Sequence, residues 1–375
     1  MKNPLNIYVD CIVFKLQRVG GISVYFSEII QRLLSSEFNV TYIEQEHVSL
    51  NLIRKELPIP TNKILIEKTV IPKLLRYLPI NIKLKQRSIV HSSYYRISSD
   101  VNAVNIVTVH DFNYEYYRKG FAKYIHSLQK RNAINKADGI ICISENTKRD
   151  LLKFNAGIDS DKITVIYHGA SKAFYPINKS TINIADNFID RIINDKYILF
   201  VGGRLYYKNF NLSIDVVARL ENCMLVIVGG GPATKDELSN LDEKLKNRYI
   251  LIDSVSTENL NTLYNYAFCM LYPSRYEGFG IPILEAMQAG CPVVSTKESS
   301  IPEVAGNAGL LVDDICSEAF LDKILRLENV SYRASIISAG LQQAKKFTWD
   351  KTYHETIRFY CDVFNKKFGE VISVH

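Results

Sequence analysis

The sequence predicts an α/β protein of two doubly wound domains, each with a parallel β-sheet covered by helices on both faces. Short apolar runs alternate with helical patterns along the whole chain, and this alternation is typical of parallel sheets buried on both sides. The length of 375 residues exceeds one ordinary core and suits two domains. Hydrophobic residues make up 47% of the chain and charged residues 23%, a balance that indicates a packed globular protein.

Apolar runs with the length and composition of strands occur in both halves of the chain. They are residues 6–9, 104–109, 139–143 and 163–167 in the first half, and residues 197–201, 224–228, 268–272 and 292–295 in the second. The alternation pauses over residues 172–195, a polar stretch without a strand pattern. We interpret this stretch as a linker, so we expect a first domain over residues 1–178 and a second over residues 190–348.

The net charge of +7 is unevenly distributed along the chain. Residues 1–180 contain 26 Lys and Arg against 15 Asp and Glu, a net charge of +11, and the remaining residues carry −4. The densest basic segment, residues 61–90, mixes apolar residues with Lys63, Lys68, Lys73, Arg76, Lys83, Lys85 and Arg87 against Glu67 alone. This mixture suits the surface of an anionic membrane. A solvated basic face on an ordinary helical hairpin has the same composition and remains the alternative.

The sequence also predicts the cellular compartment. No run approaches the roughly 18 apolar residues of a membrane span, and the start of the chain lacks the apolar stretch of a secretory signal. The seven cysteines are scattered without a CxxC pair, which favours reduced, buried thiols over disulfides or a zinc site. We expect a cytoplasmic protein, peripheral at the inner face of the cytoplasmic membrane if the basic segment binds lipid.

A candidate anion site follows the strand over residues 197–201. This strand ends in Gly202, Gly203 and Arg204, and Lys208 lies just before a predicted helix. Ligands of open α/β sheets bind beyond the carboxyl ends of strands, and a helix N-terminus attracts anions through its free N–H groups and dipole. The two cations therefore predict a diphosphate site. A solvent-facing loop with ordinary surface cations is the alternative.

A second cluster of candidate site residues lies in the segment EGFGIPILE over residues 277–285. Its glycines permit a tight turn, and Pro282 suits the first position of a helix. Glu277 then lies in a loop and Glu285 in the first helical turn, so both carboxylates can accept hydrogen bonds from sugar hydroxyls. Alternatively, Glu285 is only a helix N-terminal carboxylate stabilised by the helix dipole.

Four motifs between Val201 and Asp313 together resemble glycosyltransferase family 4. They are VGGRLYYKN, VIVGGGP, YPSRYEGFGIPILEAMQAGCPVV and SSIPEVAGNAGLLVD, and they are similar to mannosyltransferase-like members of bacterial surface-polysaccharide synthesis. The first half matches more loosely, through Gly20-Gly21-Ile22, Val109-His110-Asp111 and ISENTKRDL. The resemblance implies the GT-B fold, in which two domains face each other across a cleft and a C-terminal helix, here residues 349–375, crosses back to the first domain.

The resemblance implies roles for residues of the second domain. Arg204 and Lys208, with Gly203 beside them, look like the residues that bind the donor diphosphate, and Glu285 looks like the carboxylate that holds the ribose. Glu277 looks like the contact to the transferred sugar. The backbone expected beside that sugar belongs to Phe279, Gly280 and Ile281.

In the first domain, Gly20 and Gly21 resemble the loop that lets the backbone approach the phosphates. His110 resembles the histidine set against the sugar. The four residues to which the resemblance gives a catalytic part are thus Arg204, Lys208, Glu277 and His110. A simple strand–helix turn at the glycines and a structural histidine at position 110 are the alternatives.

The resemblance implies a retaining hexosyltransferase without a cofactor or required metal. Its donor would be a nucleoside-diphosphate sugar, GDP-mannose first and a UDP-sugar next. Its acceptor would be a saccharide, lipid-linked through a polyprenyl carrier, in surface polysaccharide or O-antigen synthesis. A sugar-nucleotide epimerase of the same fold and a non-catalytic nucleotide-sugar-binding protein are the alternatives. The pI of 8.8 raises the question of nucleic acid, but the acidic second half and the lack of a recognised nucleic-acid module oppose such a partner.

Overall fold

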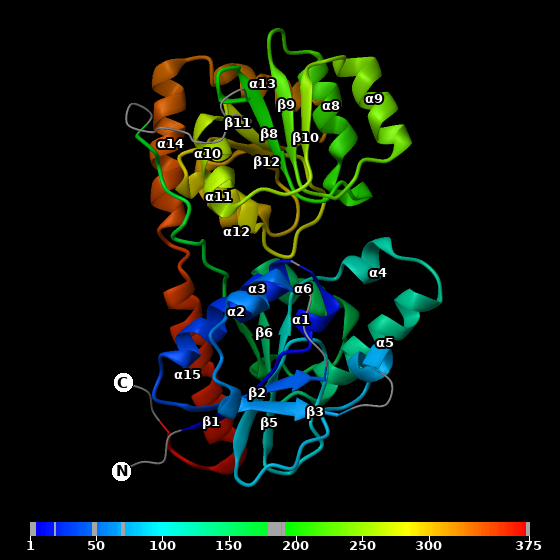
Figure 1. The fold of residues 1–375 in the computed structure, drawn as a ribbon, viewed down its shortest axis with the longest axis vertical. Helices are drawn as coiled ribbons and strands as arrows, with labels where there is room; N and C mark the ends of the chain where they lie inside the picture. The colour runs from blue at the N-terminus through cyan, green and yellow to red at the C-terminus, as the bar shows by residue number, and fades with distance from the viewer. Residues whose placement is uncertain are drawn as a thin grey trace. The chain divides into compact units, whose positions relative to one another are not determined.

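The computed structural model describes residues 5–18, 20–46, 51–68, 72–178, 189 and 192–372. The chain forms two compact units: the first comprises Met1–His168 and Trp349–His375, and the second comprises Gly169–Thr348. Each unit contains one parallel sheet with helices packed against it (Figure 1). The predicted class, α/β with two doubly wound parallel-sheet domains, is therefore confirmed. The proposed linker over 172–195 lies partly outside the described residues, and the contact-based boundary falls earlier, between residues 168 and 169.

The first unit is built on a seven-stranded sheet of order β3-β2-β1-β4-β5-β6-β7, in which all neighbouring strands run parallel. The strands are β1 (Asn6–Asp10), β2 (Asn39–Gln45), β3 (Ile64–Glu67), β4 (Ser88–Ser92), β5 (Ala103–Val109), β6 (Gly139–Cys142) and β7 (Ile163–Val165). Every residue of β4, β5 and β6 is buried, as expected for central strands covered on both faces.

The helices of the first unit come from both of its chain segments. They are α1 (Val13–Leu16), α2 (Gly21–Leu34), α3 (Leu52–Glu56), α4 (Asn113–Tyr117), α5 (Phe121–Lys136), α6 (Glu145–Phe154) and α15 (Trp349–Phe368). The helical hairpin expected for a solvated basic face over residues 61–90 is wrong, although the basic face itself stays an alternative to a membrane surface. The segment forms the short 3₁₀ helix η1 (Thr61–Lys63), strand β3, the 3₁₀ helix η2 (Pro72–Tyr77) and strand β4, with residues 69–71 outside the described part.

The C-terminal helix α15 packs on the sheet of the first unit, against α2, β4, β5 and β6. A buried chain of polar groups joins it to the sheet: His91 Nδ1 lies 2.5 Å from the Tyr360 hydroxyl, and His91 Nε2 lies 2.8 Å from Thr108 Oγ1. Trp349 at the start of α15 is also buried in this core. The helix that ends the chain is thus an integral part of the first unit.

The second unit has a six-stranded parallel sheet of order β10-β9-β8-β11-β12-β13. The strands are β8 (Tyr197–Val201), β9 (Met224–Val228), β10 (Tyr249–Ile252), β11 (Cys269–Tyr272), β12 (Val293–Thr296) and β13 (Leu310–Val312). The helices are α8 (Phe210–Ala218), α9 (Lys235–Leu245), α10 (Thr257–Tyr266), α11 (Ile281–Gln288), α12 (Ile301–Ala305), α13 (Ser317–Arg326) and α14 (Val330–Ala344). The strand order reverses between β8 and β11, where doubly wound sheets bind ligands.

Two sequence-based expectations concern the chain as a whole. All seven cysteines are free thiols and six of them are buried, which agrees with the predicted reduced state. Among the described residues, no helix has both the length and the apolarity that crossing a membrane requires.

Candidate active site

The candidate site of the second unit lies at the carboxyl ends of three adjacent strands, β9, β8 and β11. The loop after β8 carries Arg204 and Lys208, the turn after β9 carries Gly229–Gly231, and the loop after β11 carries Glu277. Because the strands are parallel, these loops gather at one edge of the sheet. The residues that the sequence analysis selected in this half therefore surround the point where the strand order reverses.

Arg204 is nearly buried and is anchored by groups of its own unit. Its Nη1 donates to the Gly229 carbonyl at 2.7 Å, and its Nη2 donates to the Gly231 carbonyl at 2.8 Å. Its Nε donates to the Glu237 carboxylate at 3.1 Å. A guanidinium has five N–H donors, so these bonds fix its position and leave part of its donor capacity for a ligand.

The turn after β9 is shaped around this guanidinium. Gly229, Gly230 and Gly231 all adopt positive φ angles, between 71° and 90°, which residues with a Cβ atom rarely adopt. A Cβ atom at Gly230 would lie 2.6 Å from Arg204 Nη1. The three glycines thus permit the close approach of backbone carbonyls to Arg204.

Lys208 and Glu277, which the sequence analysis assigned to different parts of a donor, contact each other directly. Lys208 Nζ lies 2.5 Å from Glu277 Oε1 and donates to the Tyr272 hydroxyl at 2.9 Å. Both charged side chains are largely buried. Burial, reinforced by the neighbouring Glu277 carboxylate, holds the pKa of Tyr272 well above its usual value. The phenol therefore stays neutral, and its proton is available for a hydrogen bond to Glu277.

The loop that carries Glu277 is held by two serines that follow β12. The Glu277 backbone N–H donates to Ser299 Oγ at 2.7 Å, and Ser300 Oγ donates to the carbonyls of Glu277 at 2.9 Å and Phe279 at 3.0 Å. Ser299 has a φ of 51°, in the left-handed region that non-glycine residues rarely occupy. Such a conformation persists only where surrounding contacts impose it. The hydrogen bonds between the serines and the Glu277 loop therefore fix both segments.

The loop leads into α11 through Gly280. This residue is the N-cap of the helix, with φ of 105°, and Ile281 and Pro282 begin the first turn as predicted. Phe279 is buried, with its ring 5.9 Å from that of Phe347. In the first turn Pro282 has no N–H, and the Ile283 N–H donates to the Gly280 carbonyl at 3.0 Å, so this helix start offers fewer free donors than most.

Glu285 lies on α11 and has a different partner from Glu277. The Tyr264 hydroxyl donates to Glu285 Oε2 at 3.2 Å. Burial raises the pKa of Glu285 to about 7, although the hydrogen bond from Tyr264 lowers it. Glu285 is therefore protonated at a higher pH than an ordinary surface carboxylate.

Of the remaining selected residues, Gly20, Gly21 and His110 belong to the first unit and Gly203 to the second. Gly20 and Gly21 begin α2, where Gly20 is extended with φ of −179° and a Cβ atom at Gly21 would meet open space. Gly203, in the second unit, likewise has space for a Cβ atom, with its nearest neighbour, Leu205, 3.9 Å away. Local packing therefore does not require glycine at positions 21 and 203, whereas a Cβ atom at Gly20 would lie 2.6 Å from Gln17 Oε1.

His110 follows β5 and is buried, and its Nε2 has no hydrogen-bond partner among the described residues. Burial, followed by the nearby Lys130 cation, lowers the pKa of His110 to about 3, so the imidazole is neutral near pH 7. Tyr25 and His168 pack against it, with ring centroids 5.3 and 5.7 Å away. His168 is itself buried in the first unit.

Sequence reasoning missed Tyr272, Tyr264 and the two serines. Tyr272 is the last residue of a correctly predicted strand, and its position at the carboxyl end was a usable signal. Tyr264 lies within α10 and Ser299 follows β12, and nothing in their local sequence indicates that they contact Glu285 and Glu277.

Comparisons with known proteins identify the family of the chain. The family model for glycosyl transferases group 1 matches residues 185–343, and the model for glycosyltransferase family 4 matches residues 19–173. The O-antigen chain mannosyltransferase B of Escherichia coli is 30% identical over 269 residues, covering 68% of this chain and 69% of that protein. The O-antigen chain mannosyltransferase RfbU of Salmonella typhimurium is 28% identical over 258 residues, covering 68% of each protein.

Among solved structures, sucrose-phosphate synthase from Thermosynechococcus elongatus has a TM-score of 0.74 at 16% identity. The match covers 96% of this chain and 100% of that one, and at this identity it establishes the fold alone. From the family models, the relatives and the fold together, the chain belongs to glycosyltransferase family 4 and is a glycosyltransferase of the GT-B type.

Proposed function

We propose that this glycosyltransferase transfers a hexose, with retention of configuration and without a required metal, from a nucleoside-diphosphate sugar to a lipid-linked saccharide. GDP-mannose is the first candidate donor and a UDP-sugar is the second. The names of the two bacterial relatives support a mannosyl donor and a place in O-antigen or other surface polysaccharide synthesis.

The contact between Lys208 and Glu277 carries this proposal. The pair lies over the point where the strand order reverses, and both groups are largely buried. A buried ion pair adds little to stability by itself, because the cost of removing both charges from water offsets much of their attraction, so this pair is better explained as part of a site. A diphosphate that takes Lys208 as its counter-ion leaves the Glu277 carboxylate to accept hydrogen bonds from the sugar hydroxyls.

The proposed reaction breaks the bond between the anomeric carbon and the diphosphate oxygen, whose electron pair stays with the diphosphate. The acceptor hydroxyl forms the new bond on the same face of the sugar, and the departing phosphate oxygen takes its proton. Arg204 and Lys208 stabilise the negative charge that develops on the diphosphate. The backbone of Phe279, Gly280 and Ile281 orients the sugar beside Glu277.

We also assign roles to His110 and Glu285, although neither residue neutralises the negative charge that develops on the diphosphate. With a pKa of about 3, His110 is a weak base near neutral pH, so we assign it the orientation of the sugar. Glu285 accepts hydrogen bonds from the ribose hydroxyls. We assign Gly20 and Gly21, which have no side chain beyond a hydrogen atom, a backbone contact with the donor.

A panel of nucleotide sugars tests the proposal, with thermal stabilisation, donor hydrolysis and transfer to a lipid-linked saccharide as the measurements. We expect one GDP- or UDP-sugar to stabilise the protein and to be hydrolysed slowly, with the anomeric configuration retained in the product. Turnover should persist in excess chelator. Donor conversion to an epimer without transfer would contradict the proposal, and stabilisation without turnover would indicate a binding protein.

We also propose that the enzyme works at the cytoplasmic face of the membrane, because a lipid-linked acceptor is presented there. The basic segment 61–90 supports this location: Lys68, Lys83, Lys85 and Arg87 are all exposed. Basic side chains near an anionic bilayer contribute about 1 kcal/mol each to binding.

A further inference from the structure

Helix α5 of the first unit exposes large apolar side chains on its outer face. Phe121 is 76% exposed, Tyr124 is 64% exposed and Leu128 is 54% exposed. Their spacing of three and four residues places them on one side of the helix. The opposite side is buried through His126, Lys130 and Ala133. An apolar stripe that faces outward while the inner face is already packed indicates a contact surface.

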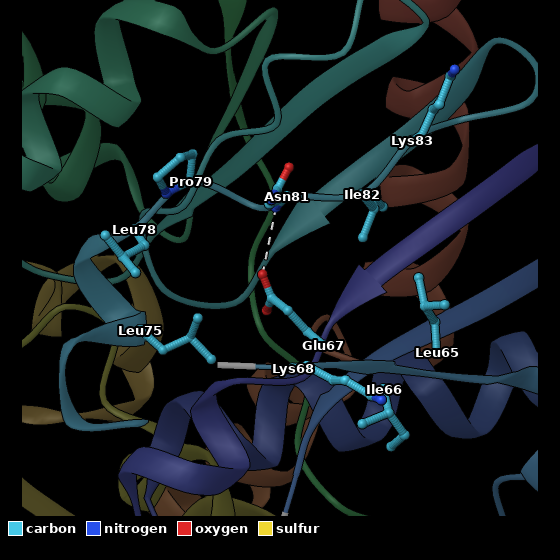
Figure 2. A pocket seen from close by; sticks show the side chains of 10 residues that line it. All are labelled: Leu65, Ile66, Glu67, Lys68, Leu75, Leu78, Pro79, Asn81, Ile82 and Lys83. Carbon is cyan, nitrogen blue, oxygen red and sulfur yellow. Dashed lines mark hydrogen bonds between the residues drawn. The ribbon is translucent and has the colours of Figure 1, made fainter. Parts of the chain in front are cut away.

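A groove of about 610 Å³ opens beside strand β3, at the edge of the same sheet (Figure 2). Most of its lining is aliphatic and consists of Leu65, Ile66, Leu75, Leu78, Pro79 and Ile82. Three of these side chains, Leu65, Ile66 and Leu78, are exposed to solvent. The volume falls in the usual range for a site that binds a small apolar ligand or part of one.

The charge that this groove presents outward is positive. Lys68 and Lys83 line it and are exposed. Glu67, the one carboxylate in the lining, is neutralised by Arg96 from inside the unit: both carboxylate oxygens accept from Arg96 Nη2, at 2.7 and 2.9 Å. Figure 2 shows Glu67 in the groove beside Asn81. Lysines around an aliphatic groove match the anionic head and the hydrocarbon chain of an acidic lipid.

The two apolar surfaces are joined within the first unit. The side chain of Gln129 on α5 donates to the Arg76 carbonyl of η2. The two helices lie side by side in Figure 1. The chain runs from η2 directly to Leu78, in the wall of the groove. Exposed cations also border α5: Arg118 and Lys119 precede it, and Arg131 continues its outer face.

From these observations we infer that the outer face of α5 and the groove beside β3 form one docking face for an anionic lipid bilayer. Phe121, Tyr124 and Leu128 enter the interfacial layer, where amphipathic aromatic side chains are favoured. The groove takes one hydrocarbon chain of an acidic phospholipid, with its phosphate beside Lys68 and Lys83. The inference rests on the proposed function, since it specifies the surface that meets the bilayer in which the acceptor is anchored.

Flotation of the full chain with vesicles of phosphatidylcholine, with and without phosphatidylglycerol, tests the inference. We expect binding only with phosphatidylglycerol, and weaker binding at high salt. The double variant Phe121→Ser, Leu128→Ser and the single variant Leu78→Ser should each weaken binding, the double variant by on the order of tenfold or more. Leu152→Ser is the matched control, because Leu152 lies on α6 and is 40% exposed, close to the 47% of Leu78.

Donor hydrolysis, which needs no bilayer, is measured on the same variants. Equal hydrolysis in all of them with selective loss of vesicle binding supports the docking face. The inference is overturned if the groove variant and the α5 variant both bind phosphatidylglycerol vesicles as well as the wild type does. It is also overturned if the wild-type protein does not bind these vesicles. Self-association that Phe121→Ser, Leu128→Ser abolishes, without vesicle binding, assigns the face to a second copy and also overturns it. A protein that binds vesicles but turns over no nucleotide sugar fails the proposed function alone.

Discussion

Two side chains of the described residues hydrogen-bond Lys208 Nζ, and only one of them, Glu277, is charged. The Glu277 carboxylate neutralises it, while the Tyr272 hydroxyl fixes the position of Nζ without competing for charge. In the proposed site, a diphosphate that displaces Glu277 can leave the bond from Lys208 to Tyr272 in place. The proposal therefore makes Tyr272 a positioning residue, which acts on the substrate through Lys208.

Replacing Tyr272 by Phe should lower turnover while leaving the fold intact, because only the buried hydroxyl is removed. The loss of one hydrogen bond to a charged group predicts a decrease in kcat of about tenfold. Lys208→Ala should cost on the order of 10²–10³ in kcat. Tyr249→Phe is the matched control, since its hydroxyl bonds Asp242 at the surface. Equal kcat values for Tyr272→Phe and the wild type would show that Lys208 needs no such support.

The protonation of Glu285 predicts a pH dependence of nucleotide binding. With a pKa of about 7, the carboxyl is neutral below pH 7 and charged above it, and the charged form accepts hydrogen bonds from ribose hydroxyls more strongly. We therefore expect nucleoside diphosphate affinity, measured by calorimetry, to rise as the pH increases from about 6 to about 8.

Two variants distinguish this effect from titration of the phosphate. Glu285→Gln should weaken binding and remove the protein's share of the pH dependence, and Tyr264→Phe should move its midpoint upward. Because the folded pKa exceeds the unfolded value of 4.5, the same carboxyl also lowers the stability of the free protein as the pH rises between these two values. An unchanged pH profile in Glu285→Gln would remove Glu285 from the binding step.

At the scale of elements, the turn into α11 depends on backbone that only glycine adopts readily. Gly280 has a φ of 105°, and a Cβ atom there would lie 3.2 Å from Ile283 Cδ1. Gly280→Ala should destabilise the protein by about 1–3 kcal/mol, measured by urea unfolding. Gly21→Ala is the control, because a Cβ atom at that helix start meets open space, and it should be neutral or stabilising. Comparable destabilisation by both variants would contradict a special requirement at Gly280.

Most strands could be predicted from apolar runs in the sequence, but short or polar strands could not: β10 and β13 are apolar yet only four and three residues long, too short for a period to identify them. All eight predicted strands are present within a residue or two of their predicted bounds, but β2, β3, β4, β10 and β13 were missed. Strand β4 is fully buried yet contains two serines and His91. Its polar groups are satisfied by distant partners, such as Tyr360 on α15, which local sequence does not reveal.

The candidate site shows the same limit. The placement of Arg204, Lys208 and Glu277 at one edge of the sheet was predictable from glycines and charges at strand ends. Their partners were not, because the contact of Lys208 with Tyr272 depends on β8 lying beside β11. Strands that are adjacent in the sheet but distant in the chain leave no periodic signal in the sequence.

At the scale of the whole molecule, the first unit is built from both ends of the sequence, and the second unit lies between them in the chain. The chain leaves the first unit at His168 and returns at Trp349, so α15 closes a core whose other parts were formed by the start of the chain. The stability of the first unit therefore depends on contacts between the two ends of the sequence. The lone tryptophan, Trp349, lies in this core and reports on it by fluorescence.

A pair of tyrosine variants tests whether the two units unfold separately. Tyr360→Phe leaves His91 Nδ1 buried without its partner and should destabilise the first unit by about 1–3 kcal/mol. It should shift the urea midpoint of Trp349 fluorescence downward. Tyr197→Phe removes a buried bond to the Leu263 carbonyl in the second unit, so it should leave that midpoint unchanged while accelerating amide exchange in β8 and α10. If both variants shift the fluorescence midpoint equally, the two units unfold as one cooperative body, and the independence that their separate cores predict is refuted.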